Sequence, residues 1–148
     1  MQLAYAILAD NAQVMPDGKF TIFSGGIEVL TAPSLPALTP SLAIVIRLVL
    51  EPGEIDIQHH FHVELLNPDG ENLLSSDSGK QFTPNKNTPV IPDLPLSYMF
   101  VLNFPGLIFL AAGKHMFRLF VDGTLIGEIP MFIVESSKSK PIANDEEV

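Results

Sequence analysis

The sequence contains no cysteine and no tryptophan. Without cysteine the chain can form no disulfide, no thiolate zinc site, no cysteine nucleophile and no iron–sulfur cluster held by thiolates. Charged residues make up only 17% of the 148 residues, compared with about 25% in an average soluble domain. Basic residues are the scarcer kind, since 8 Lys and Arg face 17 Asp and Glu and leave a formal net charge of −9. This balance argues against nucleic acid and anionic membrane surfaces as partners, because both are bound through positive charge.

Long windows free of proline are also missing. The 13 prolines recur along most of the chain, and a proline inside a helix costs about 3 kcal/mol or more. Between the prolines and glycines lie short runs rich in Val, Ile, Leu and Phe. Short apolar runs separated by turn residues are typical of all-β folds. We therefore predict a two-sheet antiparallel β-sandwich of immunoglobulin-like or C2-like outline.

The segment 55–66 shows the clearest strand pattern. One of its faces carries the apolar side chains of Ile55, Ile57, Phe61, Val63 and Leu65. Polar side chains occupy most of the intervening positions. Since side chains alternate between the two faces of a strand, we expect the apolar set in the core and the polar set in water.

Turn residues separate the other expected strands. Asp122-Gly123 predicts a two-residue hairpin with a type I′ turn. Gly25-Gly26 predicts a bulge or kink within one strand region, and Pro105-Gly106 a turn between two buried strands. We expect the other strands at 3–9, 19–24, 27–30, 42–50, 73–76, 98–104, 107–110, 115–121 and 125–134.

The chain is predicted to form one domain over residues 1–135, followed by a polar, disordered tail at 136–148. The apolar stretch 3–9 is too short for a secretory signal and has no basic residue before it. The uncharged stretch 94–113 is interrupted by Pro and Gly, which lipid-exposed backbone does not tolerate. We therefore expect a cytoplasmic protein that does not enter the membrane.

Three strings in the sequence resemble parts of a known family. Residues 6–10 (AILAD) and 17–26 (DGKFTIFSGG) resemble the opening of an uncharacterised bacterial family of small proteins with a domain of unknown function. Residues 112–123 (AGKHMFRLFVDG) resemble the closing hairpin of that family. The resemblance covers about residues 1–134 and implies a β-sandwich and a bacterial source, but no activity and no site residues.

The histidines supply the main candidate for chemistry. His60, His62 and Glu64 recur at a spacing of two, which aligns them on one strand face, and His115 is a distant fourth candidate ligand. The His-x-His pair resembles part of the first cupin motif, which implies a metal-dependent enzyme. The spacing departs from that motif at three points, between Gly53 and His60, between His62 and Glu64, and between Glu64 and Gly70, so we expect no metal and no other cofactor.

Apolar side chains on both faces of a strand indicate a different function. A two-layer sandwich buries one face of each strand, yet the segment 98–110 carries apolar side chains on both. We therefore expect a homodimer or a protein partner, with contact candidates Tyr98, Met99, Phe100, Leu107 and Phe109. The favoured hypothesis is a non-enzymatic module acting by protein binding or self-association. The alternatives are a cupin-like metal enzyme and a carbohydrate-binding module, the latter disfavoured by the lack of Trp and the presence of only two Tyr.

Overall fold

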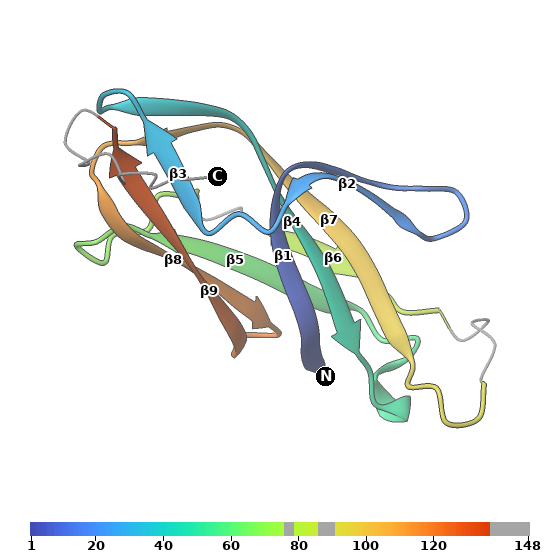
Figure 1. Cartoon of the computed structure of the whole chain (residues 1–148). Helices are drawn as coiled ribbons and strands as arrows, with labels where there is room; N and C mark the ends of the chain where they lie inside the picture. The colour runs from blue at the N-terminus through green and yellow to red at the C-terminus, as the bar shows by residue number, and fades with distance from the viewer. Residues whose placement is uncertain (76–78, 86–90, 137–148) are drawn as a thin grey trace.

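The computed structural model describes residues 1–75, 79–85 and 91–136. These residues form two β-sheets that lie against each other (Figure 1). Sheet A has the order β2-β1-β4-β7, with β1 at Gln2–Val14, β2 at Phe20–Gly25, β4 at Ala37–Val49 and β7 at Ser97–Phe109. Sheet B has the order β3-β9-β8-β5-β6, with β3 at Val29–Ala32, β5 at His59–Leu66, β6 at Gly79–Phe82, β8 at Gly113–Val121 and β9 at Thr124–Glu135. The predicted all-β, two-sheet fold is confirmed.

Both sheets contribute to one hydrophobic core. Phe61 of β5 and Phe100 of β7 meet there with ring centroids 4.9 Å apart and nearly perpendicular planes. The predicted alternation of β5 is confirmed from His59 onward, because Phe61, Val63 and Leu65 are fully buried while His60 is exposed. The edge-to-face contact of Phe61 with Phe100 stabilises the fold beyond what the burial of the two rings contributes.

The alternation does not extend back to Ile57, as the sequence had indicated. Ile57 is exposed, and the strand begins only at His59. Asp56 has a φ of 59°, a left-handed conformation that interrupts an extended strand. A 3-10 turn at Pro52–Glu54 precedes this irregular stretch.

The kink at Gly25-Gly26 is where the chain leaves one sheet for the other. After β2 the backbone passes Gly26, which has a φ of 85°, and the next strand, β3, belongs to sheet B. There β3 pairs in parallel with β9, from Val29 opposite Phe132 to Ala32 opposite Glu135. The expected continuation of one strand past the two glycines is therefore wrong, because it is a crossover between sheets.

Pro105-Gly106 does not form the expected turn. β7 runs without interruption from Ser97 to Phe109, in constant register with β4. The two residues instead change which side chains face the core. Phe100, Leu102 and Phe104 contribute to it before the break, and Leu107 and Phe109 after it. Gly106 permits this change of phase with a φ of 70°.

The other turn predictions have mixed outcomes. Asp122 and Gly123 both have positive φ, and Val121 pairs with Thr124, as a type I′ hairpin requires. Residues 73–75 of the expected strand at 73–76 are not in a strand, and residue 76 lies outside the described residues. The strand β6 was not anticipated.

The tail expected at 136–148 lies, apart from Ser136, outside the described residues. In the described part of the chain, no helix is long and apolar enough to cross a membrane.

Phe61→Ala tests the core. The substitution is expected to lower the free energy of unfolding by about 3–5 kcal/mol, because it leaves a cavity between the two sheets. Urea unfolding followed by circular dichroism measures the loss. His60→Ala, on the outer face of the same strand, serves as the control and should cost about 0.5 kcal/mol or less. A loss below about 1 kcal/mol for Phe61→Ala would show that the core does not depend on this ring.

Candidate functional site

The outer face of sheet B carries most of the residues that the sequence singled out. His60 and His62 lie next to each other on β5 with ring centroids 6.4 Å apart. The Glu64 carboxylate lies 3.9 Å from His62 Nε2 and 3.6 Å from an Arg118 guanidinium nitrogen. Arg118 also approaches Glu128 at 3.5 Å. These side chains form a mixed-charge surface network in which Glu64 is already paired.

His115, the fourth candidate ligand, lies on the opposite face of sheet B. Its side chain is buried in the core, with its ring perpendicular to that of Phe109 at a centroid distance of 5.2 Å. His115 Nδ1 donates to the Gly113 carbonyl at 3.1 Å, while its buried Nε2 accepts no hydrogen bond from the described residues. Across the described ranges, no three side chains of the metal-ligating types converge on a common point.

A pair that the sequence did not reveal, formed by the buried His59 and the exposed Asp122, lies at the start of β5. His59 Nδ1 is 2.7 Å from Asp122 Oδ2, and His59 Nε2 is 2.8 Å from the Glu54 carbonyl oxygen. The other Asp122 oxygen accepts the His60 backbone N–H at 2.9 Å. Since both ring nitrogens of His59 face acceptors, the doubly protonated imidazolium satisfies both contacts and the neutral ring only one.

The charges of this pair stabilise each other. Burial alone lowers the pKa of His59, but the hydrogen bonds to Asp122 and Glu54 and the charges of both acids outweigh it, so the pKa is raised above its ordinary 6.5. The hydrogen bonds from His59 and from the His60 N–H lower the pKa of Asp122 below its ordinary 3.8. The pair thus fastens the β8–β9 hairpin to β5.

Most of the expected contact residues face the core. Phe100 and Phe109 are buried, and Tyr98 and Leu107 pack partly buried against the core. Of the five candidates only Met99 is exposed, on the outer face of sheet A. Phe100 and Phe109 are therefore not available for contact with a partner, contrary to the expectation, because their side chains are buried in the core between the two sheets.

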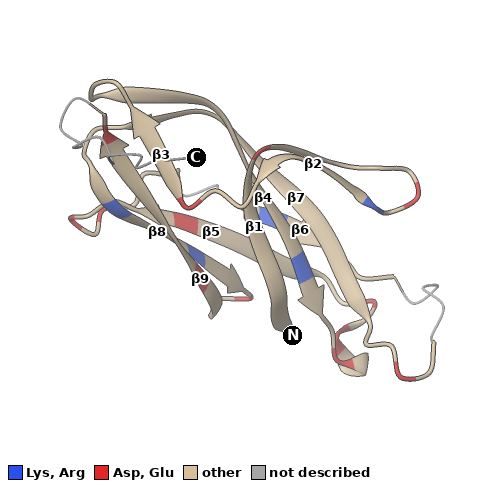
Figure 2. Cartoon of the chain, viewed as in Figure 1, with Lys and Arg blue, Asp and Glu red and all other residues tan. Residues whose placement is uncertain are grey.

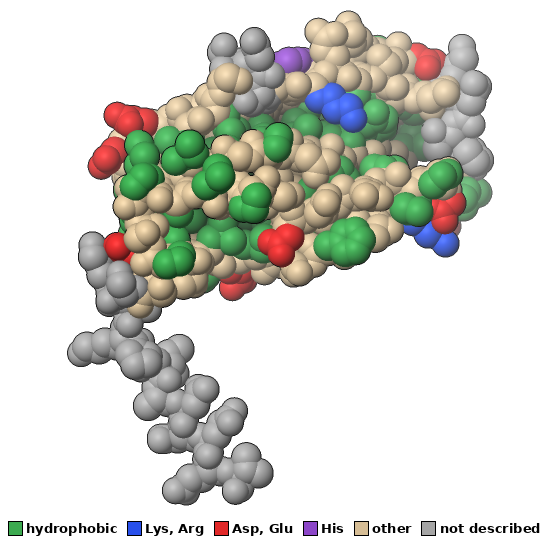
Figure 3. All heavy atoms as spheres, turned by 90° about the horizontal axis from the view of Figure 1, so that it is seen from above, with side chains coloured by type: hydrophobic (Ala, Val, Ile, Leu, Met, Phe, Trp, Pro, Cys, Tyr) green, Lys and Arg blue, Asp and Glu red, His purple; other side chains and the backbone are tan. Residues whose placement is uncertain are grey.

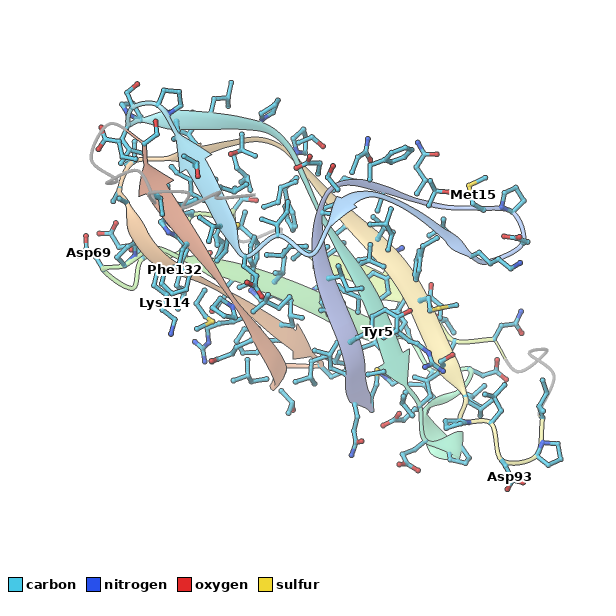
Figure 4. The ribbon with its side chains drawn as sticks, in the orientation of Figure 1. Tyr5, Met15, Asp69, Asp93, Lys114 and Phe132 are labelled. Atoms are coloured by element: carbon cyan, nitrogen blue, oxygen red, sulfur yellow. The ribbon has the colours of Figure 1, made fainter. Side chains whose placement is uncertain are left out.

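The exposed apolar side chains of sheet A lie next to those candidates. Leu38 and Ile108 form a cross-strand pair and are 64% and 56% exposed. Tyr5, labelled in Figure 4, reaches across β4 so that its hydroxyl contacts Met99 Sδ at 3.9 Å. Seen from above, hydrophobic side chains gather at the end where β3 and the first half of β4 lie (Figure 3). Figure 2 shows that β7 carries no charged residue, unlike sheet B and the loops.

A cavity of about 600 Å³ opens between β3 and the first half of β4. Its lining combines buried apolar residues with exposed hydroxyl groups and one carboxylate, that of Asp10. Residues between 30 and 41 form most of its wall, and Asp10, Phe109 and Ile133 complete it from three other parts of the chain, so no local motif defines the cavity.

Asp122→Asn tests the pair with His59. Asparagine tolerates the positive φ of this position but supplies no charge. The contribution of His59 is fully present below pH 6.5 and is lost as the pH rises through its raised pKa in the folded state. That of Asp122 is present above pH 3.8 and is lost as the pH falls through its lowered pKa. The wild type should therefore exceed the variant in stability mainly between the lowered pKa of Asp122 and the raised pKa of His59.

Urea unfolding from about pH 5 to about pH 9 measures this difference. Carbon-detected titration of the histidine rings should also give a lower pKa for His59 in the variant. A stability difference between wild type and variant that does not change with pH would contradict the assignment.

Elemental analysis tests the metal hypothesis. We expect no stoichiometric Zn, Mn, Fe or Ni, because His115 is separated by the sheet from His60 and His62 and Glu64 already pairs with Arg118. About one tightly held metal ion per chain, lost in the His60→Ala/His62→Ala double variant, would overturn this expectation.

Comparison with known proteins places the chain in a family. Neither a search of curated proteins nor a search of solved structures returns a match. A family model matches residues 4–134, a range that includes all three strings on which the resemblance rested. The chain therefore belongs to a family of unknown function, DUF6941.

Proposed function

We propose that the protein is a non-enzymatic binding module that associates with a second copy of itself through β7. The observation that carries this proposal is the position of β7 at the edge of sheet A. Its thirteen residues, Ser97–Phe109, contain no charge, and among the described residues its outer edge pairs with no strand.

An edge of this kind favours strand pairing. Edge strands expose unpaired N–H and C=O groups, and proteins usually protect them with charged side chains, prolines or short length. β7 is long and uncharged, and its single proline, Pro105, leaves the eight residues before it unprotected. A second β7 added in antiparallel orientation about a two-fold axis would continue sheet A into the partner.

The side chains flanking this edge support the same contact. Met99 and Ile108 are exposed on the outer face of β7, and Leu110 follows it at 72% exposure. A standard interface takes about 800 Å² from each partner, which is less than a tenth of the 9235 Å² accessible surface of this chain. The net charge of −9 opposes self-association, but none of that charge is carried by β7.

The remaining parts of the proposal concern context. We place the module in the cytoplasm, as one domain over residues 1–135, without a nucleic-acid partner. Net charge supports the last point. The metal-enzyme alternative is weakened by the separation of His115 from His60 and His62, and the carbohydrate alternative by the absence of Trp.

Light scattering at micromolar concentration tests self-association. The wild type should have twice the mass of the 16.1 kDa chain. Met99→Lys/Ile108→Lys should give the single-chain mass, because two lysines on each strand would bring four like charges to one face of the joined sheet. A single-chain mass for the wild type would overturn the proposal.

Val29→Lys is the matched control, since Val29 is equally apolar and 51% exposed but lies on β3 of sheet B. It should leave the mass of the dimer unchanged. Circular dichroism and thermal melting establish that each variant is folded. A double variant that is folded and still dimeric would place the interface elsewhere and contradict the role of β7.

A further inference from the structure

We propose that the cavity between β3 and β4 binds a small organic cation, an ammonium group carried on a short apolar chain. Its volume of about 600 Å³ falls within the range of about 300–1,000 Å³ typical of small-molecule sites. The proposal concerns a different surface from the β7 edge and does not depend on self-association.

The cavity exists because β1 does not pair with the first residues of β4. β1 pairs with β4 only as far as Ala9 opposite Ala43, and then turns away to pair with β2. Residues 37–41 of β4 therefore have no strand neighbour on that side in the described structure. β3, at the edge of sheet B, borders the same space, so the sandwich is open along this flank (Figure 1).

The inner wall of the cavity suits an apolar chain. Ala32, Phe109 and Ile133 line it and are buried, and Leu30 lines it partly buried. Prolines 33, 36 and 40 form part of the remaining wall. Because each proline fixes its own φ, little backbone freedom remains to be lost when a ligand binds.

The polar residues of the cavity suit a ligand that donates hydrogen bonds. Four residues with hydroxyl groups, Thr31, Ser34, Thr39 and Ser41, line it, and the Ser41 hydroxyl donates a 2.6 Å hydrogen bond to the Asp10 carbonyl. An ammonium group carries three donors and no acceptor, so hydroxyl, carbonyl and carboxylate oxygens are its natural partners.

The charge of the lining selects for a cation. Asp10 is the only ionisable residue among the described residues that line the cavity. Within the described structure its carboxylate makes no hydrogen bond and no ion pair. No Lys, Arg or His from those residues is present in the lining to hold an anion, and the chain as a whole carries −9. Phosphates and carboxylates are therefore disfavoured, and an ammonium group gains a charge-assisted hydrogen bond to Asp10.

Three probes that share one chain separate these contributions: hexylammonium, 1-hexanol and hexanoate. Titration of each into the labelled full chain is followed by ¹H–¹⁵N correlation spectra at neutral pH. We expect saturable shifts at Asp10, Thr31 and Thr39, with hexylammonium binding most tightly, hexanol more weakly and hexanoate most weakly. Equal affinity for the cation and the anion, or shifts scattered over the surface, would overturn the proposal.

Asp10→Asn identifies the group responsible. It should weaken hexylammonium about fivefold, as expected for an ion pair near the surface, and leave hexanol unchanged. Asp69→Asn is the control, because it removes the same charge from a turn outside the cavity, labelled in Figure 4. If both variants weaken hexylammonium equally, binding follows net charge alone and the site is refuted.

Discussion

The fold depends on a strand, β4, that must be covered on both faces. All five side chains from Leu42 to Ile46 are buried, although they point alternately to opposite faces of sheet A. Sheet B covers one face with the main core. On the other face Ala43 and Val45 pack against Ala12 of β1 and Phe20 of β2. The part of the β1–β2 hairpin beyond Ala9, which no longer pairs with β4, thus covers the second face of β4 and keeps it from water.

This requirement explains the openings of the sandwich. To reach the outer face of β4, β1 has to separate from β4 beyond Ala9, which leaves residues 37–41 without a neighbour on that side. The chain then crosses to sheet B at Gly25-Gly26 and forms β3 at the far edge. The cavity occupies the space that a straight continuation of β1 would fill. Burial of β4 thus determines where the cavity lies.

Local patterns in the sequence predicted the fold class and most strands, but not the contacts between distant segments. Alternation placed Phe61 in the core, and Asp122-Gly123 specified its hairpin, since both depend on neighbouring residues. The pair of His59 with Asp122 joins residues 63 positions apart, and no local signal predicts such a contact. Pro105-Gly106 was misleading because a turn and a change of phase within a strand use the same residues.

The two proposed surfaces adjoin at Leu38 and at Phe109, the last residue of β7, and this decides how they can be separated. Leu38 lines the cavity and also pairs with Ile108 on the outer face of sheet A. A substitution of Leu38 would therefore alter both surfaces and distinguish nothing. Ile108 and Met99 do not line the cavity, and Asp10 does not lie on β7. Among the described residues Asp10 shares no contact partner with Met99 or Ile108, so its substitution should change ligand binding and theirs should change self-association, independently of each other. A dependence of one effect on the other would show that a ligand in the cavity acts on the β7 edge through Leu38.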